Sequence, residues 1–472
     1  MKEARPIVVL VVIVAAIIVV ATHVWIKFSG QPGGTNSSEP VTQFRLGTSC
    51  LAQNPVKGVQ WLRKAADRNY APAENILGVC YATGTGVTQD YAQAVGWIRK
   101  AARQNNADAE NNLGLYYEHG QGVTRDFAKA VGWFRKAAEQ DNSLGEFNLA
   151  ECYDHGWGVK SDKSVAAQWY AKAAERNLAI AQFNLANLYY SGEGVTRDDT
   201  QALALYQKAA DEGLPQAQYI LGRRYEDGDG VTADPLEAIN WYLKAARQNE
   251  PNAENELGNC YANGVGVGID EVAAVKWYRL AAEQNYAEAQ FNLGLCCLNG
   301  QGMATNDAEG LEWFKKAVSQ NNADAQLGLG NCYEAGQGVP EDHSLAAQWY
   351  RKAAEQGNPQ AQYNLAVGYL VGDGVAENAA EAVKWLDKAA EQNFAEAQNN
   401  LGACFAAGRG VATDYVQAYK WFKLAAINGS KQAEENLRKA MGLLTPEQTT
   451  NAERMVLEFK PGREVVSSQA NQ

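Results

Sequence analysis

Ten Gly-x-Gly pairs recur along the chain, and a glycine-rich loop is one of the few backbone elements that can hold a phosphate group. The first glycine of each pair recurs every 36 residues from Gly84 to Gly408, and the second recurs from Gly86 to Gly410. A phosphate-binding loop has Lys-Ser/Thr directly after its last glycine, and here the residue after the second glycine is always Val or Met. We therefore interpret them as turns, because glycine readily adopts the left-handed conformation of a sharp helix exit.

Six of the eight cysteines share one position of this period, and thiolates can form disulfides or bind metal ions. Equivalent positions on stacked helices lie roughly 8–10 Å apart, whereas a disulfide needs alpha carbons within about 7 Å of each other. The same spacing is wrong for a compact metal shell. We therefore predict mostly buried helix positions, with no metal site and no cofactor. The cysteines of this column are Cys80, Cys152, Cys260, Cys296, Cys332 and Cys404, and its other members include Tyr116, Leu188, Arg224 and Gly368.

The remaining polar residues do not suggest catalysis. His119 and His155 lie one repeat apart, each just before a Gly-x-Gly pair, which is too far for one metal ion unless the chain curves tightly. We find no Ser/His/Asp or Cys/His arrangement, so we predict that the protein is not an enzyme. The net charge of −12 argues against nucleic acid as a partner, because such a surface repels phosphates.

Two antiparallel helices per repeat are predicted around each Gly-x-Gly pair: helix A before it and helix B after it. Ala73, Leu77 and Tyr81 recur at the spacing of one helix face. Asp90 begins helix B as an N-cap, in a column of eight Asp and two Asn, and Asn105 ends it in a column of Asn, Asp and Gly.

Tryptophan also recurs every 36 residues, from Trp61 to Trp421, with Leu205 as the exception. We expect each ring to be buried between helices. Neither helix of a repeat can bury its apolar face alone, so the repeats are expected to stack on their neighbours.

The first residues carry a membrane signal. Residues 7–26 form an apolar run of 20 residues, enough for a helix to cross a bilayer. Lys2 and Arg5 precede the run, which favours residues 1–6 in the cytoplasm and the remaining chain outside it. We predict an uncleaved single-pass signal anchor; cleavage after Ala21 is the alternative. Residues 27–41 read as a flexible linker, and the repeats would be periplasmic or in the cell envelope if the source is bacterial.

The repeated sequence resembles the Sel1-like repeat. Close copies of its motifs are Ala-x-x-Gln-Phe-Asn-Leu-Gly at 287–294, Gly-x-Gly-Val-x-x-Asp at 192–198 and Ala-x-x-Trp-Tyr-x-Lys-Ala-Ala at 346–354. The resemblance covers residues 42–444 and implies an all-α, right-handed α-solenoid related to tetratricopeptide repeats, with helix A lining the concave side. It also implies a scaffold or adaptor. We divide this region into one truncated repeat, ten full repeats and a final half repeat, followed by a capping helix at 445–460 and a disordered tail at 461–472.

A column of asparagines on helix A is the candidate binding surface. Asparagine inside a helix is mildly unfavourable, and its amide offers both donors and an acceptor. In tetratricopeptide repeats the matching asparagine binds the backbone of an extended peptide, so the resemblance implies a protein or peptide ligand here. The alternative is that these amides bond to the neighbouring helix or face solvent. The candidate residues on this concave face are Asn112, Asn148, Asn184, Asn187, Asn292, Asn331, Asn364, Asn400, His119 and His155.

A second hypothesis is a structural envelope protein that binds polysaccharide or cell wall. Aromatic side chains next to the asparagine column would then serve as stacking surfaces for sugar rings. These aromatic residues are Phe147, Phe183, Tyr219, Phe291 and Tyr363.

Overall fold

The computed structural model describes residues 39–461, which form α-helices and contain no strand. These residues fall into two compact units that divide between Ala233 and Asp234, here called the first and second unit. The predicted membrane anchor, most of the linker and nearly all of the tail lie outside the described residues. Within residues 39–461, no helix combines the length and the apolar character needed to cross a membrane.

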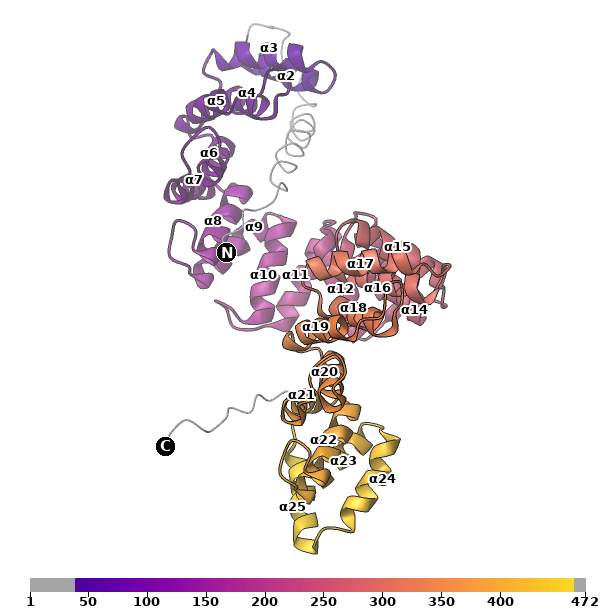
Figure 1. The fold of residues 1–472 in the computed structure, drawn as a ribbon. Coiled ribbons are helices and arrows are strands. Elements are labelled where there is room, and N and C mark those ends of the chain that lie inside the picture. The colour runs from indigo at the N-terminus through magenta and orange to yellow at the C-terminus, as the bar shows by residue number, and fades with distance from the viewer. Residues whose placement is uncertain (1–38, 462–472) are drawn as a thin grey trace. The chain divides into compact units, whose positions relative to one another are not determined.

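In the first unit, helices A and B alternate along the chain as stacked pairs (Figure 1). Its A helices are α2 (Pro40–Leu51), α4 (Ala71–Thr83), α6 (Ala107–His119), α8 (Ser143–His155), α10 (Ala179–Ser191) and α12 (Pro215–Asp227). Its B helices are α3 (Pro55–Ala66), α5 (Tyr91–Arg103), α7 (Phe127–Glu139), α9 (Lys163–Glu175) and α11 (Asp199–Asp211). The pair α2–α3 is the truncated repeat that the sequence predicts.

The second unit continues the same alternation and ends in an additional helix. Its B helices are α13 (Pro235–Ala246), α15 (Glu271–Glu283), α17 (Asp307–Ser319), α19 (His343–Glu355), α21 (Ala379–Glu391) and α23 (Tyr415–Ile427). Its A helices are α14 (Pro251–Asn263), α16 (Ala287–Asn299), α18 (Ala323–Ala335), α20 (Pro359–Val371), α22 (Ala395–Ala407) and α24 (Lys431–Met441), followed by α25 (Pro446–Glu458). The prediction of an all-α chain of stacked helix pairs is therefore confirmed for the described residues.

The helix ends follow the capping residues that the sequence indicates. Asp90 Oδ1 accepts hydrogen bonds from the backbone N–H groups of Ala92 (2.9 Å) and Gln93 (3.0 Å), and the other Asp and Asn residues of this column cap their helices in the same way. The eight Asn and Asp residues after helix B have φ between 57° and 67°. The first glycine of each Gly-x-Gly pair has φ between 66° and 76°, which confirms the turn interpretation.

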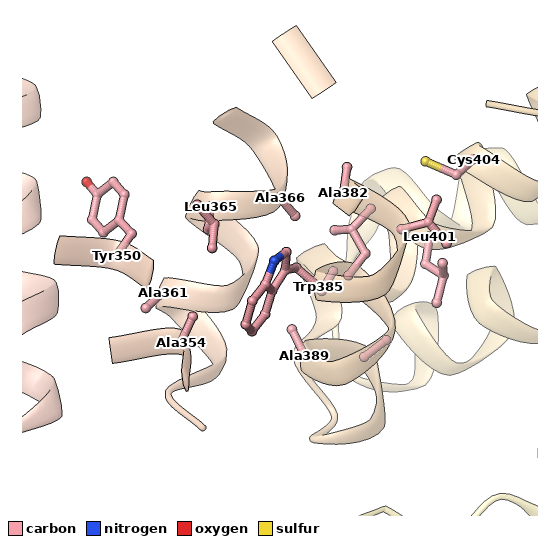
Figure 2. Close-up of a cluster of buried hydrophobic side chains, with 14 of the residues drawn as sticks. Tyr350, Ala354, Ala361, Leu365, Ala366, Ala382, Trp385, Ala389, Leu401 and Cys404 are labelled. Atoms are coloured by element: carbon pink, nitrogen blue, oxygen red, sulfur yellow. The ribbon is translucent and has the colours of Figure 1, made fainter. Parts of the chain in front are cut away.

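Helix A and helix B approach each other at a residue that has almost no side chain. A Cβ atom on Gly114 would lie 2.4 Å from Phe134 Cε1, and one on Gly258 would lie 2.4 Å from Tyr278 Cε1. Carbon atoms in good contact are about 3.5–4.0 Å apart, so each ring occupies the space that a larger residue would need. The core of the second unit shows the same use of small residues, with Trp385 of α21 lying beside Leu365 of α20 among alanines (Figure 2).

The tryptophan column is less buried than expected. Four of its rings are buried, those of Trp241, Trp313, Trp385 and Trp421, and the other six are half-buried. A lysine three residues later covers the ring in most repeats; Lys100 Nζ, for example, lies 3.9 Å from the ring centroid of Trp97. The methylene groups of the lysine can shield the tryptophan ring from water while the ammonium group stays solvated.

A column of buried Glu and Gln residues lies near the start of helix A, and the sequence analysis did not predict that these polar residues are buried. Gln320 Nε2 donates to Gln290 Oε1 (2.8 Å), and Gln290 Nε2 donates to the Ala282 carbonyl (3.2 Å). Gln290 thus links helix B of its own repeat to helix B of the preceding one, and Gln362 and Gln398 do the same. The Glu residues accept a bond from the end of helix B of their own repeat, as Glu254 does from Gln284 Nε2 (2.6 Å). The column comprises Glu74, Glu110, Glu146, Gln182, Gln218, Glu254, Gln290, Gln326, Gln362 and Gln398, none more than 5% exposed.

The last helix covers the end of the second unit. Helix α25 begins with a capping box, in which Gln448 N donates to Thr445 Oγ1 (3.3 Å) and Thr445 N donates to Gln448 Oε1 (2.9 Å). The rings of Trp421 and Phe459 then meet edge to face, with centroids 5.6 Å apart. These contacts hold α25 against α23.

The close contact between helices predicts opposite effects for two glycines of one repeat. We expect Gly114→Ala to destabilise the protein by about 1–3 kcal/mol, because the added methyl group overlaps the Phe134 ring. Gly132→Ala, in α7, meets no atom within 4 Å and should stabilise the protein by up to about 1 kcal/mol through helix propensity. Urea unfolding measures both changes, and a Gly114→Ala variant as stable as Gly132→Ala would contradict this packing.

The buried glutamates predict a pH dependence of stability. Burial raises the pKa of Glu254 to about 7, above the ordinary value of about 4.3. The stabilising contribution of Glu254 is therefore present below the unfolded-state pKa and is lost as the pH rises through 7. Glu254→Gln should raise the melting temperature at pH 8 and have a much smaller effect at pH 5.

The reverse substitution in the next repeat provides the matched control. Gln290→Glu should lower the melting temperature at pH 8 more than at pH 5. At pH 8 the introduced side chain must be buried either as a desolvated carboxylate or with a proton taken up from solvent, and both cost free energy. Equal effects of both variants at the two pH values would show that ionisation of this column does not affect stability.

Candidate functional site

The predicted site residues are distributed over both units. The first unit carries Asn112 and His119 on α6, Asn148 and His155 on α8, and Asn184 and Asn187 on α10. The second unit carries Asn292 on α16, Asn331 on α18, Asn364 on α20 and Asn400 on α22. They recur on successive A helices of each unit, so they form a repeated surface feature and not one compact site.

The asparagine amides of the first unit bond to the A helix of the preceding repeat. Asn112 Nδ2 donates to Asn75 Oδ1 (3.0 Å), and Asn148 Nδ2 donates to Asn111 Oδ1 (2.8 Å). Asn75 and Asn111 are buried. Each buried asparagine therefore orients the amide of the next repeat.

The second unit repeats this arrangement. Asn292 Nδ2 donates to the buried Asn255 Oδ1 (3.0 Å), and Asn436 Nδ2 donates to Asn399 Oδ1 (2.9 Å). One N–H donor of each of these amides thus bonds to a neighbouring helix, which is the alternative that the sequence left open. An asparagine amide has two N–H donors and a carbonyl oxygen, so a ligand contact remains a prediction.

The asparagines differ in how much surface they offer. Asn148 is only 7% exposed, so it offers a ligand the least surface, whereas Asn112 and Asn292 are half-buried. Asn184 Nδ2 donates to Glu151 Oε1 (2.9 Å) and not to an asparagine. Only some members of the predicted column therefore present an accessible amide.

Asn364 and Asn400 are half-buried and bond within their own helices. Asn364 Oδ1 accepts a hydrogen bond from Gln360 Nε2 (2.9 Å). Asn400 Oδ1 accepts one from Asn399 Nδ2 (3.4 Å). Neither residue donates to an asparagine of the preceding A helix as Asn112 does, although the Asn364 side chain also bonds to Tyr350 of α19.

Asn187 and Asn331 are exposed, and each accepts a hydrogen bond from a tyrosine of helix B. The Tyr206 hydroxyl lies 2.6 Å from Asn187 Oδ1, and the Tyr350 hydroxyl lies 2.8 Å from Asn331 Oδ1. The rings of these tyrosines are buried, so only the hydroxyl groups reach the helix-A surface. The sequence analysis missed these tyrosines, although their recurrence in the helix-B motif was a visible signal.

The two histidines serve the ends of their A helices. The exposed ring of His155 stacks on Trp157, with centroids 4.5 Å apart, and Trp157 stacks in turn on Phe127 at 6.4 Å. His119 ends α6 and is half-buried. Across residues 39–461, no group of three or more His, Cys, Asp and Glu is placed to hold a metal ion.

No disulfide forms within residues 39–461, and all the cysteines but Cys50 are buried. Burial raises the pKa of the Cys80 thiol to about 12 and that of Cys332 to about 11. Since the thiolate is the nucleophilic form, these thiols are chemically inert at neutral pH. Their prediction as buried helix residues is confirmed.

The aromatic residues of the second hypothesis pack inside the repeats. Phe147 contacts the Tyr170 ring with centroids 5.9 Å apart, and Phe291 stacks on Phe314 at 5.6 Å. Phe183 and Tyr363 likewise contact Tyr206 and Phe394. These contacts occupy ring surface that stacking on a sugar would need.

The comparisons with known proteins agree with this architecture. A family model described as the Sel1 repeat matches residues 43–70 and ten further consecutive segments from 71–106 to 395–430. The comparison with curated proteins gives no match.

Two solved structures are similar over most of their own length. A protective antigen of uropathogenic Escherichia coli strains that displays an SLR fold is 36% identical, with a TM-score of 0.74, over 90% of this chain and 92% of that chain. A Sel1 repeat protein from Oxalobacter formigenes is 31% identical, with a TM-score of 0.50, over 65% of this chain and 89% of that chain. Because the matched repeats make up most of the sequence and of the stacked helix pairs, this protein belongs to the Sel1 repeat family.

Proposed function

We propose that this protein is a membrane-anchored, non-catalytic scaffold that binds a protein or peptide along the helix-A face of its repeats. The observation that carries the proposal is the set of asparagine amides that buried asparagines of the preceding repeat hold in place, as Asn75 holds Asn112 and Asn255 holds Asn292. An amide with a fixed orientation loses little conformational entropy when a ligand binds. Such a surface is suited to recognising another chain.

An extended peptide matches this chemistry. Its backbone presents N–H and C=O groups at regular intervals, and an asparagine amide can bond to both kinds of group. Each repeat then adds a small contact to a long surface, as in other solenoid proteins. The exposed Asn187 and Asn331, each oriented by a tyrosine hydroxyl, extend the set of polar contacts.

The membrane anchor is part of the proposal and is supported by the sequence of residues 7–26. This arrangement would place the amino terminus in the cytoplasm and the repeats outside it. The flexible composition of residues 27–41 would let the repeats reach partners near the membrane surface. Polysaccharide binding by the aromatic residues is not proposed, because their ring contacts lie inside the repeats.

Paired substitutions test the asparagine surface. The full chain carrying Asn112→Ala and Asn292→Ala should bind a membrane protein partner roughly tenfold more weakly, because two amide hydrogen bonds to the ligand are lost. The control carries Asn75→Ala and Asn255→Ala, which breaks the same two bonds between repeats but keeps the half-buried amides. The control should weaken binding less.

The measurement is the affinity for a partner captured with the wild-type chain and then purified. Equal affinity of the wild type and the Asn112/Asn292 variant would contradict binding at these amides. Equal losses in both variants would instead assign the asparagines a purely structural role.

The anchor has a separate test. The mature protein should keep residues 7–26 and remain in the membrane fraction after an alkaline carbonate wash, because a spanning helix is not held by charge. Intact-mass measurement of the purified protein gives the amino terminus directly. A mass that corresponds to cleavage after Ala21 would replace the anchor with a signal peptide.

A further inference from the structure

A cavity of about 120 Å³ opens between α18, α19 and α20 in the second unit. Its wall is apolar where Ala346, Ala347 and Leu365 line it, and polar where Glu334 and Asp373 do. A cavity of this size could hold several water molecules, and therefore the end of one long side chain. Asn364, a member of the predicted asparagine column, also lines it.

The cavity lies at a position where one repeat departs from the pattern. Gly368 occupies the column that holds Cys332 one repeat earlier and Cys404 one repeat later. Both cysteines are buried. Gly368 therefore lines the cavity with backbone alone, and a Cβ there would lie 3.0 Å from the Asp373 carbonyl oxygen of the following Gly-x-Gly loop.

The charged groups at the cavity are mainly acidic. The Tyr350 hydroxyl lies 2.9 Å from Glu334 Oε2, and His343 Nδ1 lies 3.0 Å from Asp373 Oδ2. Within the described structure, no hydrogen bond engages the other carboxylate oxygens, Glu334 Oε1 and Asp373 Oδ1. One oxygen of each carboxylate thus lies beside a protein group, the Tyr350 hydroxyl being shared with Asn331, and the other oxygen is open.

His343 offsets part of this acidity without reversing it. Its Nε2 lies 2.8 Å from Glu341 Oε1, and this hydrogen bond is the main cause that raises the pKa of His343. The imidazole is thereby paired with Glu341 and Asp373. No lysine or arginine lines the cavity, and the chain as a whole carries a net charge of −12.

We propose that this cavity binds a basic side chain, lysine or arginine, of an extended peptide that lies along the helix-A face. The methylene groups of such a side chain would contact Ala346, Ala347 and Leu365, and its cationic group would reach Glu334 and Asp373. Long basic side chains combine these two properties. The inference rests on the proposed peptide-binding function and adds a specificity pocket to it.

Direct binding of small probes tests the pocket. The probes are an acetylated, amidated nonapeptide of glycine and serine with one central lysine, the same peptide with norleucine in that place, and pentylamine. The full chain should bind the lysine peptide at least about fivefold more tightly than the norleucine peptide, because the ionic contacts are partly exposed to solvent. Binding is measured by isothermal titration, and it should weaken as salt is added.

Two different variants should remove this preference. Gly368→Cys installs the residue of the neighbouring repeats at the cavity wall and should narrow the cavity; its Cβ would lie 3.0 Å from the Asp373 carbonyl oxygen, so that carbonyl must shift slightly. The double variant Glu334→Gln, Asp373→Asn keeps the shape and removes the charge. Each should weaken binding of the lysine peptide at least about fivefold and leave the norleucine peptide unaffected or nearly so.

Glu355→Gln is the matched control. It removes one charge from the same helix, α19, about 18 Å along the axis from His343 at 1.5 Å per residue. Binding should change less than twofold. Equal binding of the lysine and norleucine peptides, or unchanged binding by both pocket variants, would overturn the proposal.

Two further outcomes separate the pocket from the proposed function. Pentylamine binding as tight as that of the lysine peptide would assign the cavity to a free amine and overturn the peptide ligand. The Asn112→Ala, Asn292→Ala variant can retain its protein partner, which would contradict binding at the asparagines. If the same variant still binds the lysine peptide selectively, the pocket is supported independently of the asparagine surface. The two ideas can therefore fail separately.

Discussion

The structure depends on the contact between helix A and helix B at a residue with almost no side chain. Where helix A has Gly114 or Gly258, a large ring of helix B lies against its backbone. In the tyrosine-bearing repeats this closeness also brings the tyrosine hydroxyl through to the helix-A surface, where it meets Asn187 or Asn331. One packing constraint therefore determines both the apolar core and the orientation of polar groups on the candidate binding surface.

Two polar columns then connect each repeat to the next. Buried Gln residues join successive B helices, and several asparagines join successive A helices, as Gln290 with Ala282 and Asn292 with Asn255 show. Buried polar groups are costly unless they are bonded, and here the bonds exist only when the neighbouring repeat is in register. The columns therefore favour one stacking arrangement and hold the surface amides still. Both effects suit a binding scaffold.

Departures from the repeat give individual repeats distinct surfaces. A surface that presents the same group in every repeat binds backbone well but distinguishes side chains poorly. Gly368 lines a cavity, whereas Arg224, in the same column, is buried and pairs with Asp229 at 3.1 Å. A Cβ atom on Gly230 would come no closer than 3.7 Å to another residue, whereas one on Gly194 would lie 2.4 Å from the Lys163 carbonyl carbon. Single residues thus give individual repeats different surfaces on a common framework.

The sequence by itself determined the repeat length, the all-α class, the family and nearly all helix ends, because caps such as Asp90 and Asn105 act through local backbone preferences. It identified Gly368 as an exception without indicating a cavity. It could not decide the role of Asn112, because the group that binds its amide, Asn75, lies 37 residues earlier in the chain. The sequence pattern likewise did not predict the burial of Glu254, the hydrogen bonds of the tyrosine hydroxyls or the division into two units. Only the tertiary structure decided these features, because each depends on which side chains of different repeats come into contact.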